Sequence, residues 1–182
     1  AQALKTFDTS LAPDTLEAVR DFIYERARNQ LALSYDRQAV DAVLALHPPL
    51  HQLHARIQAC IDFATRPEAV DLAAANKRIS NLLKKADGVL PALDPALLAE
   101  PAELELSSTL ARLAPQATAS LQAGDFTAAL ATLAGARDAV DRYFNEVMVM
   151  AEDTRIRANR LALLQSLHDL MNQVADLSRL AR

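Results

Sequence analysis

The feature that most limits the fold of this chain is how few residues it has for tight turns. The 182 residues include three glycines and eight prolines, and no Asn-Gly or Asp-Gly pair separates two strand-like runs. Half of the chain is apolar, yet aromatic residues make up only 4% of it and tryptophan is absent. Strands favour aromatic and β-branched side chains, whereas leucine and alanine at helical spacing are typical of helix bundles. These properties predict an all-α fold, a single helical bundle of about seven to eight helices.

The length fits one domain with a sizeable core. We expect residues 1–13 to be a linker and residues 14–182 to form the helical domain. The chain does not begin with methionine and has no signal-peptide pattern, so we expect it to be part of a longer protein. No segment approaches the roughly 18 uninterrupted apolar residues that a membrane span needs, so we expect no membrane partner. The single cysteine, Cys60, excludes an intramolecular disulfide and fits a reducing, cytoplasmic location.

Apolar residues at three- and four-residue steps, together with prolines and glycines, predict the individual helices. Asp14 is expected to cap the first helix, and Asn159 is expected to be structural. The core is expected to include Tyr143, Phe144, Met148 and Met150 of the helix that precedes residue 151. The buried face expected for the first helix consists of Leu16, Val19, Ile23, Ala27 and Leu31. The later helices are expected at about residues 36–46, 50–64, 68–86, 101–114, 115–123, 125–134, from 135 through 151, and 154–180.

The formal net charge of −4 counts against nucleic-acid binding, but the charges are unevenly distributed. Residues 76–85 carry four cations and no acid, residues 87–106 carry five acids and no cation, and residues 154–182 carry five arginines against two aspartates. Segregated charge can produce a basic surface on an acidic protein. We therefore expect cations from separate parts of the chain to converge into one positive groove.

The fourth helix provides the strongest candidate for such a surface. A solvated helix face is the ordinary explanation of a charge run, but a solvated face usually mixes both signs. Here all the charge is positive, and Asn76 and Asn81 add planar groups that can bond base edges. RNA binding is the functional interpretation of this face. Its candidate RNA-binding residues are Lys77, Arg78, Asn81, Lys84 and Lys85.

Three arginines at the start of the last helix are a second candidate. Arg155, Arg157 and Arg160 lie where the helix dipole disfavours cations, by up to about 1 kcal/mol each. Either the preceding acids, Glu152 and Asp153, offset this charge, or the arginines and the helix N-terminus together attract a phosphate. The residues alone leave both explanations open.

Tyr24 and Arg28 are a third candidate. They lie one turn apart on the polar side of the first helix. Tyr24 could stack on an unpaired base, although a tyrosine in this position is more often a half-buried aromatic residue. Arg28 adds a cation to the same side of the helix.

The sequence offers little for catalysis or metal binding. Three scattered glycines cannot form a phosphate-cradling loop, and no G-x-S-x-G or H-E-x-x-H motif occurs. A metal site at His47, His51 and His54 would need further ligands, so solvated histidines are the preferred interpretation. We expect no catalytic residue, no metal and no cofactor in this chain.

Five blocks in order carry a resemblance to a known family. They are DFIYERARN at residues 21–29, AANKRISNLLKK at 74–85, EPAE at 100–103, AGDF at 123–126, and RYFNEVMVMAEDTRIRANRLALL at 142–164. This ordered set resembles the C-terminal helical domain of bacterial glycyl-tRNA synthetase β subunits. That domain belongs with the DALR anticodon-binding bundles, which arginyl-tRNA synthetases also carry. Residues 175–182 differ from the usual end of the arginyl enzymes, which favours the glycyl family.

The resemblance implies a DALR-type bundle that binds the anticodon region of glycine tRNA and positions it for aminoacylation. It also implies an α2β2 assembly with an α subunit, upstream β-subunit domains, ATP and magnesium for the whole enzyme, and a cytoplasmic location; no DNA partner is expected. The alternative is a helical protein-interaction module without RNA binding. Residues 121–130 favour it slightly because they resemble a tetratricopeptide hairpin, although no full repeat is present.

Overall fold

A computed structural model of the chain describes residue 12 and residues 14–86 and 88–181, which form eight α-helices and no strand. The prediction of an all-α fold is confirmed. Most of the expected linker, residues 1–11 and 13, lies outside the described residues. The α-helices are α1 (Thr15–Leu31), α2 (Arg37–Leu44), α3 (Leu53–Ala64), α4 (Pro67–Leu83), α5 (Pro101–Gln122), α6 (Phe126–Ala134), α7 (Arg137–Glu146) and α8 (Thr154–Met171). The described 3-10 helices are η2 (Leu50–Gln52), η3 (Pro95–Leu97) and η4 (Leu177–Leu180).

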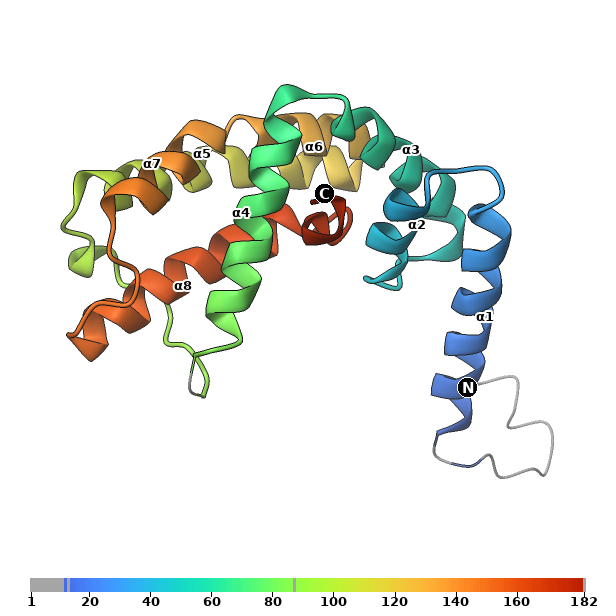
Figure 1. Cartoon of the computed structure of the whole chain (residues 1–182), viewed down its shortest axis with the longest axis horizontal. Coiled ribbons are helices and arrows are strands. Elements are labelled where there is room, and N and C mark those ends of the chain that lie inside the picture. Colours follow the sequence, from blue (N-terminus) through green and yellow to red (C-terminus); the bar gives the residue numbers. More distant parts are fainter. Residues whose placement is uncertain (1–11, 13, 87, 182) are drawn as a thin grey trace.

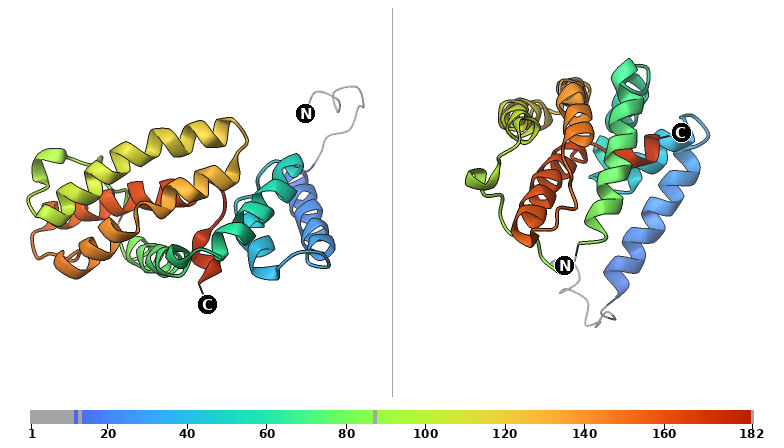
Figure 2. Two further views of the ribbon diagram at one scale, coloured as in Figure 1. Left: turned by 90° about the horizontal axis from the view of Figure 1, so that it is seen from above. Right: turned by 60° about the vertical axis from the view of Figure 1, so that its left-hand side comes forward.

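The helices form an elongated arrangement with α4 near its middle (Figure 1). Helices α5, α6, α7 and α8 run roughly along the long axis, whereas α4 crosses α8 steeply and is seen nearly end-on from above (Figure 2). Helix α1 lies at one end of the molecule and the start of α8 at the other. The C-terminal segment returns to the centre, where η4 packs against both α4 and α2.

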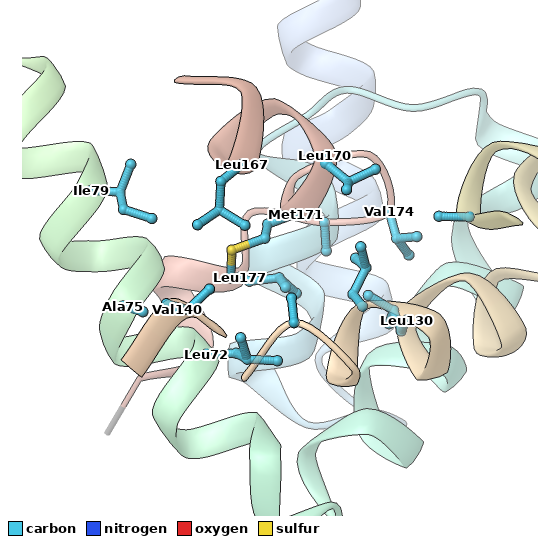
Figure 3. Close-up of a cluster of buried hydrophobic side chains, with 14 of the residues drawn as sticks. Leu72, Ala75, Ile79, Leu130, Val140, Leu167, Leu170, Met171, Val174 and Leu177 are labelled. Carbon is cyan, nitrogen blue, oxygen red and sulfur yellow. The ribbon is translucent and has the colours of Figure 1, made fainter. Parts of the chain in front are cut away.

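The core is built around this returning segment (Figure 3). Leu72 and Ile79 of α4, Leu130 of α6, Leu167 of α8 and Leu177 of η4 are each at most 1% exposed. Truncating one such side chain to alanine typically costs about 2–5 kcal/mol, because the cavity that remains cannot fully collapse. This apolar cluster fixes the position of α4 relative to α8.

A half-buried arginine of α3 holds the segment between α8 and η4. Arg56 Nη1 donates to the carbonyl oxygens of Gln173 and Val174, both at 2.8 Å, and Arg56 Nε donates to Gln52. Its guanidinium also lies over the ring of Phe126, 4.5 Å from the centroid. Burial lowers the pKa of Arg56 from its usual range. All of these contacts are internal, so Arg56 is a structural clamp.

The expected buried face of α1 is wrong for most of its length. Leu16, Val19 and Ile23 are 62%, 50% and 39% exposed, and only Leu31 is buried. Helix α1 packs mainly on α2, and its first turns extend past that partner. Asp14 precedes the helix, but its side chain accepts no capping hydrogen bond among the described residues.

The expected helix boundary at Pro115 is also wrong, because α5 continues through it. Proline removes the hydrogen bond that would end on the Ala111 carbonyl. Both residues are exposed, so water can hydrate that carbonyl, while Leu113 and Ala117 on the opposite side are buried. Tertiary packing therefore keeps α5 continuous despite its proline.

The helix boundaries that the sequence predicts at Gly124 and Gly135 are confirmed. Gly124 has φ +76°, the left-handed region that favours glycine, and the Asp125 side chain accepts the Ala128 N–H at 2.8 Å to cap α6. Gly135 follows the last residue of α6, and α7 begins two residues later. The sequence therefore predicts the α5–α6 and α6–α7 turns correctly.

The helix expected through residue 151 ends at Glu146, and Val147 is extended (φ −105°, ψ 123°). Val147 and Val149 are buried, whereas Met148 and Met150 are 72% and 45% exposed, so both methionines were wrongly assigned to the core. Alternation of this kind has the two-residue period of an extended segment. The last helix likewise stops earlier than expected, at Met171, and only η4 follows it.

Candidate RNA-binding surface

Helix α4 starts at Pro67, a residue that suits the first helical turn, and Lys84 is its C-cap. Leu72, Ala75 and Ile79 face the core, which leaves the opposite side to solvent. At 100° per residue, this open side spans roughly 120°. The α4 strip, as we call it, consists of Lys77, Arg78, Asn81, Lys84 and Lys85, all exposed.

The α4 strip carries positive charge that no carboxylate in residues 14–86 and 88–181 pairs with. Its four cations make no ion pair with any carboxylate of the described residues. Asp71, two turns toward the helix N-terminus on the same side, is paired with Arg137 of α7 at 2.7 Å. Unpaired surface cations on one face are an electrostatic feature of nucleic-acid binding sites.

One edge of the α4 strip adjoins α7 and the other adjoins a pocket. At the α7 edge, Arg78 lies over the ring of Phe144. At the other edge, a pocket of about 530 Å³ lies between α4, α8 and η4. Lys84 lines it together with His168 and Arg179, and His168 Nε2 is 3.1 Å from Ser80 Oγ. The α4 strip is therefore a positively charged surface with the stacked Arg78 at one edge and a polar pocket at the other.

Asn76, expected to bond base edges, is fully buried instead. Its amide group is bonded to that of Asn172 at the end of α8. Asn81, five residues further along α4, remains exposed and makes no side-chain hydrogen bond within residues 14–86 and 88–181. Of the two asparagines, only Asn81 is available to RNA.

At the start of α8, the structure favours the explanation in which a preceding acid offsets the charge of the arginines over the one in which a phosphate binds there. The Asp153 carboxylate accepts the backbone N–H groups of Arg155 and Ile156 at 2.8 and 3.2 Å, so it occupies the position that a phosphate would take. The Arg155 side chain is exposed. Arg157 is half-buried and donates to the Ala151 carbonyl at 3.1 Å, which reduces its availability to a ligand.

Arg160 does not belong to the surface. Its side chain is 9% exposed, and its Nε donates to Glu103 Oε1 at 2.6 Å while its Nη1 donates to the Met148 carbonyl. Glu103 Oε2 also accepts the N–H groups of Ala99 and Glu100. The expectation that Arg160 contacts RNA is corrected, because this charge is neutralised inside the bundle.

Tyr24 and Arg28 anchor α1 rather than forming an open site. The Tyr24 hydroxyl donates to the Pro48 carbonyl, and its ring meets His47 edge-on with centroids 4.7 Å apart. Arg28 Nε lies 3.0 Å from the Asp41 carboxylate. Both side chains are used to dock α1 onto α2 and the following loop.

The expected convergence into a single groove does not occur. Tyr24 and Arg28 lie on the helix at one end of the molecule, Arg155 and Arg157 at the start of α8 at the other end, and the α4 strip between them (Figure 1). Sequence reasoning missed Phe144, which it assigned to the core, and Arg179, which stands alone in the sequence. Their significance comes only from the helices that pack beside α4.

The remaining sequence alternatives concern metals and membranes. In the described part of the chain, no three His, Cys, Asp or Glu side chains gather closely enough to hold a metal ion. His54 Nδ1 lies 3.1 Å from the Tyr35 hydroxyl, which is an ordinary protein contact. Among residues 14–86 and 88–181, no helix has both the length and the apolar character needed to cross a membrane.

Comparison with known proteins identifies the domain. The family model of the DALR anticodon binding domain matches residues 72–178, more than half of the chain. The chain is 49% identical over 184 residues to a glycine–tRNA ligase beta subunit of Methylobacillus flagellatus, covering 99% of this chain and 26% of that protein. It is 49% identical over 174 residues to the beta subunit of Janthinobacterium sp. (94% and 25%) and 48% identical over 183 residues to that of Acidovorax ebreus (100% and 25%).

The chain therefore spans about a quarter of the length of these relatives. The family match begins within α4 and ends within η4, so it includes the α4 strip and excludes α1, α2 and α3. On this evidence the chain belongs to the DALR anticodon-binding domain family and is similar, over nearly its whole length, to part of the glycine–tRNA ligase beta subunit.

Proposed function

We propose that this domain binds the anticodon region of a glycine tRNA through the α4 strip. One observation carries the proposal: the anticodon-binding family match includes a helix face with four cations that no described carboxylate neutralises. The relatives are glycine–tRNA ligase beta subunits, which supports glycine tRNA as the ligand. The alternative, a protein-interaction module without RNA binding, finds no support among these relatives.

The lysines of the α4 strip bind phosphates and set the position of the RNA, whereas Asn81 and Arg78 have the planar groups that contact bases. The overall charge of −4 does not oppose this binding, because the acids lie mostly elsewhere in the sequence. An anticodon lies in a single-stranded loop, the kind of RNA whose bases are open to protein side chains.

In the longer protein, this domain acts at a distance from the chemistry. We assign it no catalytic step, and we propose that aminoacylation with ATP and magnesium takes place with an α subunit in an α2β2 enzyme of the cytoplasm. Upstream domains of the β subunit connect the two sites. Binding energy from a remote contact can be used in this way to orient the reacting end of the tRNA.

The test measures binding of the full 182-residue chain to glycine tRNA and to an unrelated tRNA by fluorescence anisotropy across a range of salt. The double variant Lys77→Glu, Arg78→Glu is expected to bind glycine tRNA more weakly, with a salt-dependence slope reduced by about 0.7–0.9 for each lost phosphate contact. The matched control is Arg37→Glu, Arg112→Glu, two exposed arginines on α2 and α5. Equal affinity of the wild-type chain for both tRNAs would contradict the proposal.

A further inference from the structure

Arg78 has a geometry that a simple phosphate contact does not require. Its Cζ lies 4.1 Å from the centroid of the Phe144 ring, so the guanidinium is stacked on the aromatic face. Arg78 is exposed on α4, and Phe144 is half-buried on α7. One face of the guanidinium is thus covered by Phe144, while Arg78 as a residue remains exposed.

Phe144 is itself packed against a buried aromatic residue. The Tyr143 ring meets it edge-on, with centroids 5.9 Å apart, and Tyr143 is fully buried. The Tyr143 hydroxyl points toward the Arg160 carbonyl, at 3.4 Å, on α8. A ring supported by the core provides a rigid base for the arginine above it, so less side-chain entropy is lost when a ligand binds.

Arg56 and Arg78 both stack on a phenylalanine ring, but they differ in whether their N–H groups are already bonded. Arg56 also lies over a phenylalanine ring, but its N–H groups are bonded to the carbonyls of Gln173 and Val174. Arg78 makes no hydrogen bond and no ion pair within the described part of the chain. The donors of Arg78 are therefore free for a ligand, whereas those of Arg56 are already used by the fold.

We propose that Arg78, supported by Phe144, is the stacking platform for one unpaired nucleobase of the bound RNA. The inference rests on the function proposed above and names a specific contact for it. Unpaired bases stack on aromatic rings and on guanidinium planes, and a planar cation placed on an aromatic ring presents such a plane ready-made. The layers are Phe144, Arg78 and the base.

The neighbours of Arg78 fit this role. Asn81 lies one turn further along the exposed side of α4, where its amide can bond the edge of a base. Lys85 follows one turn later and can contact the adjoining phosphate. Asp71, two turns before Arg78 on this side of α4, is already paired with Arg137. A stacked base therefore meets an edge-binding group on α4 and a cation in the turn that follows the helix.

The decisive variant is Arg78→Lys, which keeps the charge and removes the plane. Phe144→Leu removes the support while keeping an apolar side chain, and Arg112→Lys on α5 is the control. The probes are a stem-loop RNA with the glycine anticodon, a stem-loop with an unrelated anticodon, the glycine stem-loop carrying 2-aminopurine in the loop, and a fully paired duplex of the same stem. Affinity is measured by anisotropy on the full chain, and stacking is measured by quenching of 2-aminopurine fluorescence.

Arg78→Lys is expected to bind the stem-loop about tenfold more weakly, because lysine has no plane on which a base can stack. Its affinity for the duplex and its salt-dependence slope should match the wild type, since the number of charges is unchanged. Phe144→Leu should show a smaller loss in the same direction, and 2-aminopurine quenching should decrease in both variants. The control should behave as the wild type.

If Arg78→Lys binds the stem-loop as tightly as the wild type, with unchanged quenching, the platform is wrong while the proposed function stands. If the wild-type chain does not prefer the glycine stem-loop over an unrelated one, the proposed function fails and the platform fails with it. Because Arg78 is exposed and makes no hydrogen bond to another described residue, its lysine variant should fold normally, and circular dichroism checks this.

Discussion

Asn76 and Asn172 exchange two side-chain amide hydrogen bonds, at 2.8 and 3.2 Å, between α4 and the end of α8. Asn172 also accepts the Leu177 N–H at 3.0 Å and donates to the His168 carbonyl at 2.8 Å. This pair joins the helix that carries the candidate RNA-binding strip to the C-terminal segment that fills the core. The position of the strip thus depends on polar contacts as well as on apolar packing.

We expect Asn76→Ala to lower the free energy of unfolding by about 1–3 kcal/mol, because both amide hydrogen bonds between Asn76 and Asn172 are lost and a cavity is left at a fully buried position. Urea denaturation measures this loss. Asn81→Ala is the matched control on the same helix: it should leave stability unchanged and weaken RNA binding. If the two variants behave alike in both assays, the distinction between a buried and an exposed asparagine is wrong.

Arg160→Met is expected to destabilise the chain by about 3–5 kcal/mol, since it leaves the Glu103 carboxylate buried and without its counter-charge. Glu103 is 1% exposed in its side chain, so water cannot replace the arginine. Adding Glu103→Gln should recover part of the loss, because a neutral amide needs no counter-charge. Arg155→Met, at an exposed position of the same helix, should change the unfolding free energy by less than about 0.5 kcal/mol. If Arg160→Met and Arg155→Met lower the free energy of unfolding equally, the buried Arg160–Glu103 ion pair does not stabilise the chain as described.

Pro115→Ala is expected to stabilise the chain by about 1–3 kcal/mol, because alanine restores a backbone hydrogen bond inside α5 and removes the clash of the proline ring. Pro101→Ala is the control, since proline at the first helical position blocks no hydrogen bond. Thermal and urea unfolding measure both. A loss of stability in Pro115→Ala would show that α5 needs its proline.

Cys60 should make stability fall at alkaline pH. Burial raises the pKa of its thiol from the ordinary 9.0 to about 12, with Arg56 acting weakly in the opposite direction. The folded chain holds this proton more tightly, so the contribution is complete below pH 9 and is lost as the pH rises toward 12. Burial also raises the pKa of Tyr143, which adds to the same decline.

Urea denaturation between about pH 8 and pH 10.5 measures this decline, and Cys60→Ala should reduce its steepness. The native thiol should also resist alkylation until the chain unfolds, because it is fully buried. Rapid alkylation of the native chain would contradict this assignment.

The limits of sequence reasoning are visible at particular residues. The α5–α6 turn was predicted correctly from Gly124 and Asp125. A left-handed glycine and a helix cap depend only on residues close together in the sequence, so the sequence alone can reveal them. Pro115 was misjudged, because a solvent-facing carbonyl and the packing of the opposite side decide whether the helix continues. Met148 and Met150 were likewise misjudged: they were assigned to the core of a helix, but the helix ends at Glu146 and both side chains are exposed.

Some residues of the candidate site were placed correctly from the sequence and others were not. Spacing along α4 placed Lys77, Arg78 and Asn81 on one exposed face, and that placement holds in the structure. Asn76 and Arg160 carry the same chemical groups as their exposed neighbours, yet both are buried among partners from distant segments. Helical spacing puts Asn76 on the face of Leu72 and Ile79, and Arg160 on the face of Leu163 and Leu167, but the partners that satisfy their polar groups there come from the tertiary structure.

Taken alone, the amino-acid order determined the helical class of this domain, the approximate extent of its helices and its family, because each depends on residues close together or on an ordered set of blocks. Only the tertiary structure decided which cations remain at the surface and what lies beside them. Charge becomes available or neutralised according to the side chains that other helices bring within a few ångströms, and the stacking of Arg78 on Phe144, 66 residues away in the sequence, is such a contact.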